Sequence, residues 1–325
     1  MSPVLSPTDP IAALRALRSP WLSLWERAQG DPFQHPDWIL AWWDVFAPGP
    51  PVVAAVREGE RLMALAPLYR DPASGFVLPM GVGPSDRTDV LVDSGAPEAA
   101  ARLAAAIAAS VGDGDVLWPD VPPGGRLLAL APQPGWSREV LPGSSSAVID
   151  LDRGQEAVPS SRWRKWRMAG HRAARRGGVA VDRAGDAGAA AFADRLIALN
   201  AERHDPAAGG VFADPRMADF VRVAIPALAR AGLLEGLVLT IDGAVAGVHC
   251  GFRAAGRSYA WLGGFDPQFA FESPGTVLMG EAVLRAIARG DLALDLLRGD
   301  EPYKAAWGAV ERPLLRVAWR RTGDG

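Results

Sequence analysis

Alternating apolar residues in the second half of the chain predict a β-hairpin. The apolar runs at residues 237–241 and 244–248 flank Asp242-Gly243, a dipeptide that readily adopts the positive φ angles of a tight two-residue turn. A third run at residues 258–264 follows a second glycine-containing turn at 254–257. We therefore expect three consecutive strands that pair as an antiparallel meander.

Side-chain alternation along the second of these strands places a histidine between two glycines. Successive side chains point to opposite faces of a strand, so Gly247, His249 and Gly251 share one face. The glycines leave room above that face for something bulky, which is either a packed helix or a ligand. His249 is accordingly either a core residue or a functional one.

Helical spacing of apolar residues returns soon after the third strand. Residues 265–272 are expected to form a loop, and the apolar residues from Val277 to Ile287 recur at the spacing of an amphipathic helix. Ser273 is the expected N-cap, and Pro274 suits the first turn. The free N–H groups and dipole of such a helix start can hold a phosphate, which Gly275 would allow to approach closely. A capped surface helix explains the same residues.

The first half of the chain also alternates between helix and strand patterns. Helices are expected at residues 36–46, 97–111 and 124–130, and strands at 52–56, 62–69, 115–118, 136–141 and 147–151, with short strands near Phe76 and Val90. Polar residues and prolines interrupt the pattern at 152–159. We therefore predict two domains, residues 1–152 and 153–325, each long enough to bury its own core.

The strongest run of positive charge lies in a helix predicted at residues 160–177. No acidic residue occurs from Ala157 to Val181, and Trp163 and Trp166 can anchor one face of the helix to the core. Its cations are Arg162, Arg164, Lys165, Arg167, Arg172, Arg175 and Arg176. This helix is either an ordinary solvated surface or a wall that recognises phosphates of a nucleotide, a lipid or tRNA.

Charge and composition exclude several classes of function. The formal net charge of -3 argues against general affinity for DNA, and the four histidines show no metal-ligand spacing, so we predict no metal. The single cysteine, Cys250, excludes an internal disulfide. No apolar run approaches the ~18 residues of a membrane span, and no signal peptide is recognised, so we expect a cytoplasmic protein.

The last third of the chain resembles a known family. A strand at 292–297 is followed by Arg298-Gly-Asp-Glu-Pro-Tyr-Lys-Ala-Ala-Trp307, and this order of elements resembles the C-terminal domain of GNAT-superfamily acyltransferases of the CelD/BcsL type. Phe33-Gln-His-Pro-Asp-Trp38, Ala66-Pro-Leu-Tyr69 and Ser85-Asp-x-x-Asp89 resemble the first half of the same proteins. The resemblance covers nearly the whole chain and is most specific in its last third.

This resemblance implies an α/β (α+β) fold with two tandem GNAT-like domains, each a mixed, mostly antiparallel sheet flanked by helices. The implied activity is direct transfer of an acyl group from acetyl-CoA or another acyl-CoA to an amine. The N-terminal domain would be structural or face the acceptor, which is expected to be a small-molecule, sugar or peptidoglycan-like amine. The alternatives are Fem-like transfer from aminoacyl-tRNA, since Fem proteins are similar in plan, and a binding or scaffold protein with an inactive site.

One motif of the superfamily is kept only in part. Its diphosphate-binding signature, Gln/Arg-x-x-Gly-x-Gly/Ala, falls on Glu272, Gly275 and Val277, so the central glycine alone agrees. A carboxylate at position 272 would repel a diphosphate unless it points away or binds the amine acceptor. Donors other than coenzyme A therefore stay open.

Attack of an amine on a thioester needs a base, donors for the developing oxyanion and an acid for the leaving thiolate. His249 is the leading base, because an unperturbed imidazole titrates near pH ~6.5, and Asp300 and Glu301 are its rivals. The resemblance implies that Tyr303 protonates the thiolate. It also implies that the N–H donors come from Gly263 and Gly264, at the end of the third strand of the meander.

The remaining candidates complete the expected site. Donor binding is expected from Gly263, Gly264, Phe265, Ser273, Pro274, Gly275, Thr276 and Lys304. Acceptor binding is expected from Glu202, His204, Glu272 and Arg298. Glu202 ends a helix predicted at 189–202, and His204 lies in the loop between it and a second helix predicted at 215–231. The superfamily shapes its acceptor site with the loop between its first two helices.

Overall fold

The computed structural model describes residues 9–201 and 210–322. The chain packs as two compact units. The first contains the chain up to Ser144 together with the segment from Pro313 onward, and the second contains Ser145–Arg312. Strands β6 (Trp136–Asp150) and β12 (Val310–Arg321) each contribute residues to both units.

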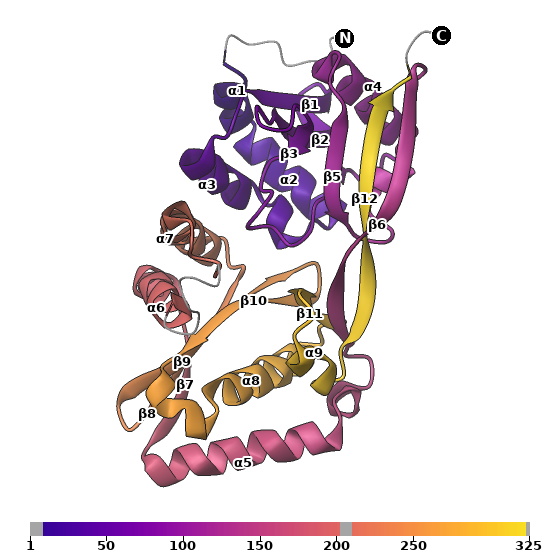
Figure 1. The fold of residues 1–325 in the computed structure, drawn as a ribbon. Helices are drawn as coiled ribbons and strands as arrows, with labels where there is room; N and C mark the ends of the chain where they lie inside the picture. Colours follow the sequence, from indigo (N-terminus) through magenta and orange to yellow (C-terminus); the bar gives the residue numbers. More distant parts are fainter. Residues whose placement is uncertain (1–8, 202–209, 323–325) are drawn as a thin grey trace. The chain divides into compact units, whose positions relative to one another are not determined.

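The first unit combines helices with a mixed sheet (Figure 1). Its helices are α1 (Pro10–Ala16), α2 (Arg18–Ala28), α3 (Pro36–Phe46) and α4 (Ala99–Val111), with short 3-10 helices η1 (Pro32–Gln34) and η2 (Arg126–Ala129). Its own strands are β1 (Pro51–Glu58), β2 (Arg61–Arg70), β3 (Val77–Pro79), β4 (Leu91–Val92) and β5 (Val116–Val121). In the sheet, β1, β2, β3, β5 and β12 lie side by side in that order, and β4 pairs with β2.

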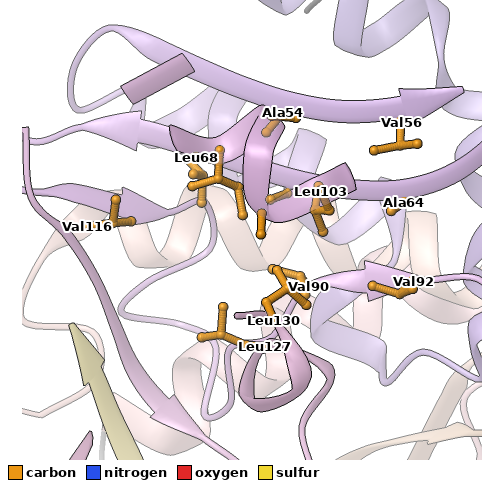
Figure 2. Packing of buried hydrophobic residues seen from close by; sticks show 14 of the residues in the cluster. Ala54, Val56, Ala64, Leu68, Val90, Val92, Leu103, Val116, Leu127 and Leu130 are labelled. Atoms are coloured by element: carbon orange, nitrogen blue, oxygen red, sulfur yellow. The ribbon is translucent and has the colours of Figure 1, made fainter. Parts of the chain in front are cut away.

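The core of the first unit forms where α4 packs on the β1–β2 hairpin. Apolar side chains recur along one face of α4, and Leu103 and Ile107 on that face are fully buried. They belong to the same cluster as Ala54, Val56 and Ala64, from the two strands (Figure 2). Burial of each large apolar side chain stabilises the unit by roughly 1.5–3 kcal/mol.

The second unit is built on the predicted meander. Its helices are α5 (Ser160–Arg176), α6 (Ala189–Ala201), α7 (Pro215–Arg230), α8 (Pro274–Ala288) and α9 (Pro302–Ala306), with 3-10 helices η3 (Gly154–Ala157), η4 (Asp186–Gly188) and η6 (Pro267–Glu272). Its strands are β7 (Val179–Arg183), β8 (Leu234–Ile241), β9 (Ala244–Ala254), β10 (Arg257–Phe265), β11 (Ala293–Arg298) and the end of β6. They lie in the order β6, β11, β10, β9, β8, β7.

Local turn chemistry explains the meander. Asp242 and Gly243 both have positive φ, 51° and 76°, as the predicted two-residue turn requires, and β8, β9 and β10 pair antiparallel. β10 and β11 pair in parallel, whereas the other neighbouring pairs for which a register is defined in this unit run antiparallel. The expected fold class is confirmed as a mixed α/β fold with a largely antiparallel sheet flanked by helices.

Helices cover both faces of this sheet, and glycines allow their close approach. A Cβ atom on Gly247 would lie 3.1 Å from Cβ of Pro274, at the start of α8. On another strand, a Cβ atom on Gly264 would lie 2.4 Å from the backbone of Leu199 in α6. The neighbour expected above Gly247 is therefore a helix. α5 lies along α8 in the same unit (Figure 1).

Several elements differ from those predicted. The helices α1 and α2 and the strands β7 and β12 were not predicted. β6 is one strand where two were expected, because the chain stays extended through the exposed residues 142–144. The helix expected at 124–130 is the single 3-10 turn of η2.

Candidate functional site

The sheet of the second unit opens where β10 and β11 part. These parallel strands pair only at Ser258 with Leu294 and at Tyr259 with Asp295. Beyond that point the pairing of β10 with β9 shifts register between Ala260 and Leu262, and the pairing of β11 with β6 also shifts. A register shift of this kind bends a strand and increases its twist. The ends of β10 and β11 therefore separate.

A buried carboxylate fixes the bend in β11. Leu297 has φ of 62°, an unusual value for a branched side chain. The Asp295 carboxylate accepts hydrogen bonds from the N–H of Leu297, at 2.8 Å, and from the Ser146 hydroxyl. Because Asp295 is 4% exposed, these bonds are formed away from water and hold the strand in its bent path.

A pocket of about 330 Å³ lies beside the separated end of β10. Its walls come from α5, β9, β10, η6, α8 and α9, together with Trp307, which follows α9. The lining residues that bear on the chemistry are Arg162, His249, Gly263, Gly264, Phe265, Ser273, Pro274, Gly275, Thr276, Tyr303 and Trp307. The pocket thus brings together residues from several segments of the chain, the first at Arg162 and the last at Trp307.

The register of β10 determines which backbone N–H faces the opening. Asp266 donates its N–H to the Ala246 carbonyl across the β9–β10 ladder. Because hydrogen-bonded pairs alternate along antiparallel strands, the N–H of Gly264 points at β9, whereas that of Gly263 points away. The Gly263 carbonyl, on the same outer edge, accepts from Nδ2 of Asn200 at 2.8 Å. Of the two predicted oxyanion donors, Gly263 is the one on the open side.

The start of α8 forms another wall of the pocket. Pro274 occupies the first helical position, as predicted, but the expected side-chain cap is wrong: Ser273 has a left-handed backbone (φ 56°, ψ 60°), and its hydroxyl caps no helix N–H. Its carbonyl instead accepts the N–H groups of Thr276 and Val277. The N–H of Gly275 has no acceptor among the described residues, and the space around its Cα is open.

Glu272 does not block this helix start. Its carboxylate accepts a hydrogen bond from Nη1 of Arg176 on α5, at 3.1 Å, and its residue is 5% exposed. Arg176 also donates to the Gln268 carbonyl and lies 4.1 Å from the centroid of the Phe269 ring. Glu272 is not among the residues that line the pocket. Arg176 therefore neutralises the charge of Glu272, the residue at which this chain departs from the superfamily signature.

His249 lines the pocket from β9 but is almost wholly buried. It is 8% exposed, and burial lowers the pKa of its imidazole to about 4. The expectation that it titrates near neutrality is therefore wrong, since it stays uncharged at neutral pH. It also borders a smaller cavity of about 10 Å³ that Glu235 lines. Within residues 9–201 and 210–322, no hydrogen bond to the ring is seen.

Tyr303 also lines the pocket, at the beginning of α9, and is 36% exposed. Lys304 beside it points elsewhere: the residue is 4% exposed, and its ammonium donates to the carbonyls of Leu297, Arg298 and Gly299. It also pairs with Glu301, at 3.0 Å. Lys304 thus fastens the end of β11 to α9.

Other predicted residues lie away from the pocket or outside the described residues. Arg298 ends β11 and Asp300 follows it, and neither lines the pocket. Glu202 and His204 fall outside the described residues. Sequence reasoning did not assign Arg162 or Trp307 to the site. The acid-free stretch from Ala157 to Val181 was the signal for Arg162, but it did not single out one cation among seven.

Comparison with known proteins gives a family match for the part of the chain that contains this pocket. Residues 160–305 match the family model described as "Acetyltransferase (GNAT) domain". The second unit contains a GNAT-fold acetyltransferase domain. The match includes every pocket-lining residue except Trp307. A search of curated proteins finds no match to the chain.

Solved structures share the fold of this GNAT-containing chain at low sequence identity. FemX has a TM-score of 0.62 and 13% identity, covering 94% of this chain and 95% of FemX. A conserved protein of unknown function from Bacteroides thetaiotaomicron VPI-5482 has a TM-score of 0.62 and 11% identity, covering 99% and 100%. The C-terminal domain (DUF2156) of a protein described as a lysylphosphatidylglycerol synthetase from Agrobacterium fabrum has a TM-score of 0.58 and 13% identity, covering 94% and 92%.

Neither a membrane-spanning helix nor a metal-binding cluster occurs among the described residues. None of the helices there combines the length and apolar character that a bilayer crossing requires. No group of His, Cys, Asp or Glu side chains in that part of the chain is arranged to hold a metal ion.

Proposed function

We propose that the second unit transfers an acyl group from an acyl-coenzyme A thioester to an amine. The pocket beside the separated end of β10 carries this proposal, because it places an outward strand N–H, an open helix start and a tyrosine around one space. A diphosphate would lie at the start of α8, where Gly275 has a free N–H and the helix dipole favours negative charge. The thioester would then reach Gly263 between β10 and β11.

In this proposal the amine nitrogen attacks the thioester carbonyl carbon and forms the C–N bond. The N–H of Gly263 stabilises the oxyanion of the tetrahedral intermediate. When the intermediate collapses, the C–S bond breaks and Tyr303 donates its proton to the departing thiolate. His249, being neutral, accepts a hydrogen bond from the amine and orients it for attack. The proton that the attacking nitrogen loses passes to water, because neither of the rival acceptors Asp300 and Glu301 lines the pocket.

We propose a sugar-like or peptidoglycan-like amine as the acceptor and the cytoplasm as the location. We also propose that residues 153–325 bind the acyl donor and that residues 1–152 are structural or face the acceptor. The CelD/BcsL type within the superfamily is proposed on the motifs given above.

A second candidate, Fem-like transfer from aminoacyl-tRNA, is favoured by the outer face of α5. Arg164, Lys165, Arg167 and Arg175 are exposed there, and none forms an ion pair with a described residue. Such a surface attracts a phosphate backbone through counterion release. The departure at Glu272 from the superfamily signature also leaves room for a donor other than coenzyme A.

Thermal unfolding with acetyl-CoA or aminoacyl-tRNA distinguishes the candidates. A ligand at ~100 times its dissociation constant stabilises the folded state by about 2.7 kcal/mol. We expect stabilisation by acetyl-CoA, and Tyr303→Phe should keep this shift while slowing thiol release on the order of 10²-fold or more. A response to aminoacyl-tRNA alone would support the second candidate, and no response to either would contradict both.

A further inference from the structure

Among the described residues that line the pocket, Arg162 is the one arginine or lysine, and it comes from outside the superfamily's diphosphate signature. Arg162, in the first turn of α5, lines the pocket together with Ser273, Gly275 and Thr276. Its Nη2 donates to Oγ1 of Thr276 at 3.3 Å. The guanidinium therefore stands at the start of α8, although the two residues are 114 positions apart in the chain.

The rest of the Arg162 guanidinium is held but not neutralised. Its central carbon lies 4.6 Å from the centroid of the Trp307 ring, a distance typical of a cation–π contact. Its Nε is buried and has no hydrogen-bond partner among the described residues. No carboxylate there pairs with it, and burial lowers its pKa, as expected for a cation without a counter-ion.

Two other arginines of the same helix are occupied by the protein itself. Arg172 donates to the Phe271 carbonyl, at 2.7 Å, and to the Ser273 hydroxyl, at 2.9 Å. Arg176 is paired with Glu272. Neither lines the pocket. Arg162 is thus the member of this group that keeps donors for a ligand.

A second buried N–H donor that lines the pocket also has no hydrogen-bond acceptor among the described residues. Trp307 lines the pocket, is 0% exposed and has an Nε1 without a partner among the described residues. Buried donors without acceptors are rare in folded proteins, because each costs on the order of 1–3 kcal/mol. An anionic ligand in the pocket would give acceptors to Arg162, beside this indole ring.

We infer that Arg162 binds the diphosphate of the donor, taking over the role that the signature assigns to the residue at position 272. Arg176 neutralises Glu272, and Arg162 supplies the missing cation from the other end of α5. A planar guanidinium suits this role, because it can donate two parallel hydrogen bonds to phosphate oxygens. This inference rests on the proposed function and adds a requirement: the donor must carry phosphate.

Titration calorimetry with Arg162→Gln tests this inference, using coenzyme A, dephospho-coenzyme A and pantetheine. The first two ligands share the diphosphate, and pantetheine lacks it. We expect Arg162→Gln to weaken binding of both diphosphate ligands about 10- to 100-fold and to leave pantetheine binding within about twofold. Arg162→Lys, which keeps a point charge, should recover part of the loss.

Arg164→Gln is the matched control, because Arg164 is exposed on the same helix and lies outside the pocket. It should bind all three ligands like the wild type. Equal binding of coenzyme A by Arg162→Gln and the wild type would overturn the inference and leave the proposed function intact. An equal loss for pantetheine would also overturn it, since it would indicate general damage to the pocket. A wild type that binds none of the ligands would contradict the proposed function and this inference together.

Discussion

At the scale of single residues, burial changes what each candidate can do. His249 occupies the predicted strand face, yet desolvation keeps it neutral, so it is suited to accept a hydrogen bond rather than to hold a positive charge. The Lys304 ammonium donates hydrogen bonds to three backbone carbonyls, whereas Tyr303 lines the pocket. Residue type alone did not separate these cases, because the difference is one of environment.

The buried imidazole makes stability depend on pH. In the unfolded chain His249 binds a proton as the pH falls through 6.5, but in the folded chain it stays neutral down to about pH 4. The free energy of unfolding that depends on neutral His249 is therefore fully present above pH 6.5, and it is lost as the pH falls towards 4. Between pH 7 and pH 5 the wild type should lose about 2 kcal/mol more unfolding free energy than His249→Gln.

Urea unfolding of both proteins at the two pH values measures this difference. His35, which is also buried and has a pKa lowered to about 4, is present in both proteins, so its contribution cancels. Equal losses in the two proteins would show that His249 does not carry the pH dependence.

At the scale of elements, glycines decide how closely helices approach each other and the sheet. A Cβ atom on Gly280 of α8 would lie 2.2 Å from the ring of Trp166 on α5, whose Nε1 donates to the Val277 carbonyl at 3.2 Å. This contact holds the basic helix against α8. The position of Arg162 therefore depends on a helix packing that a single methyl group would disturb.

Gly280→Ala should destabilise the second unit by about 1–3 kcal/mol, because the rigid indole cannot move aside without displacing α5. Gly275→Ala in the same helix is the matched control, since no atom lies within 4 Å of the added Cβ, and its stability should be equal or up to ~1 kcal/mol higher. Chemical denaturation measures both. Equal stabilities for the two variants would contradict the packing described for α5 and α8.

At the scale of the whole molecule, local signals were predictable and distant pairings were not. Asp242-Gly243 fixes its hairpin through two neighbouring residues, and the bounds of α3 follow from a local pattern. By contrast, Arg176 meets Glu272 across 96 positions, and no property of either residue alone specifies the partner. The pocket wall at the start of α8 was predicted, but the cation that completes it was not.

The same reasoning explains the missed elements. β6 crosses the sequence Pro-Gly-Ser-Ser at 142–145, which lacks the alternation of a half-buried strand. Its extension depends on ladder partners that come from other parts of the chain. The bend of β11 at Leu297 is likewise held by Asp295 and Ser146, which lies about 150 residues earlier.

The central claim is that the pocket beside the end of β10 receives the pantetheine arm of an acyl-CoA. A crystal structure of the protein with coenzyme A tests it most directly. The account predicts the diphosphate at Gly275 and Thr276, within hydrogen-bonding distance of Arg162, and the sulfur near Gly263 and Tyr303. Coenzyme A bound elsewhere, or a pocket left empty at saturating coenzyme A, would contradict the account.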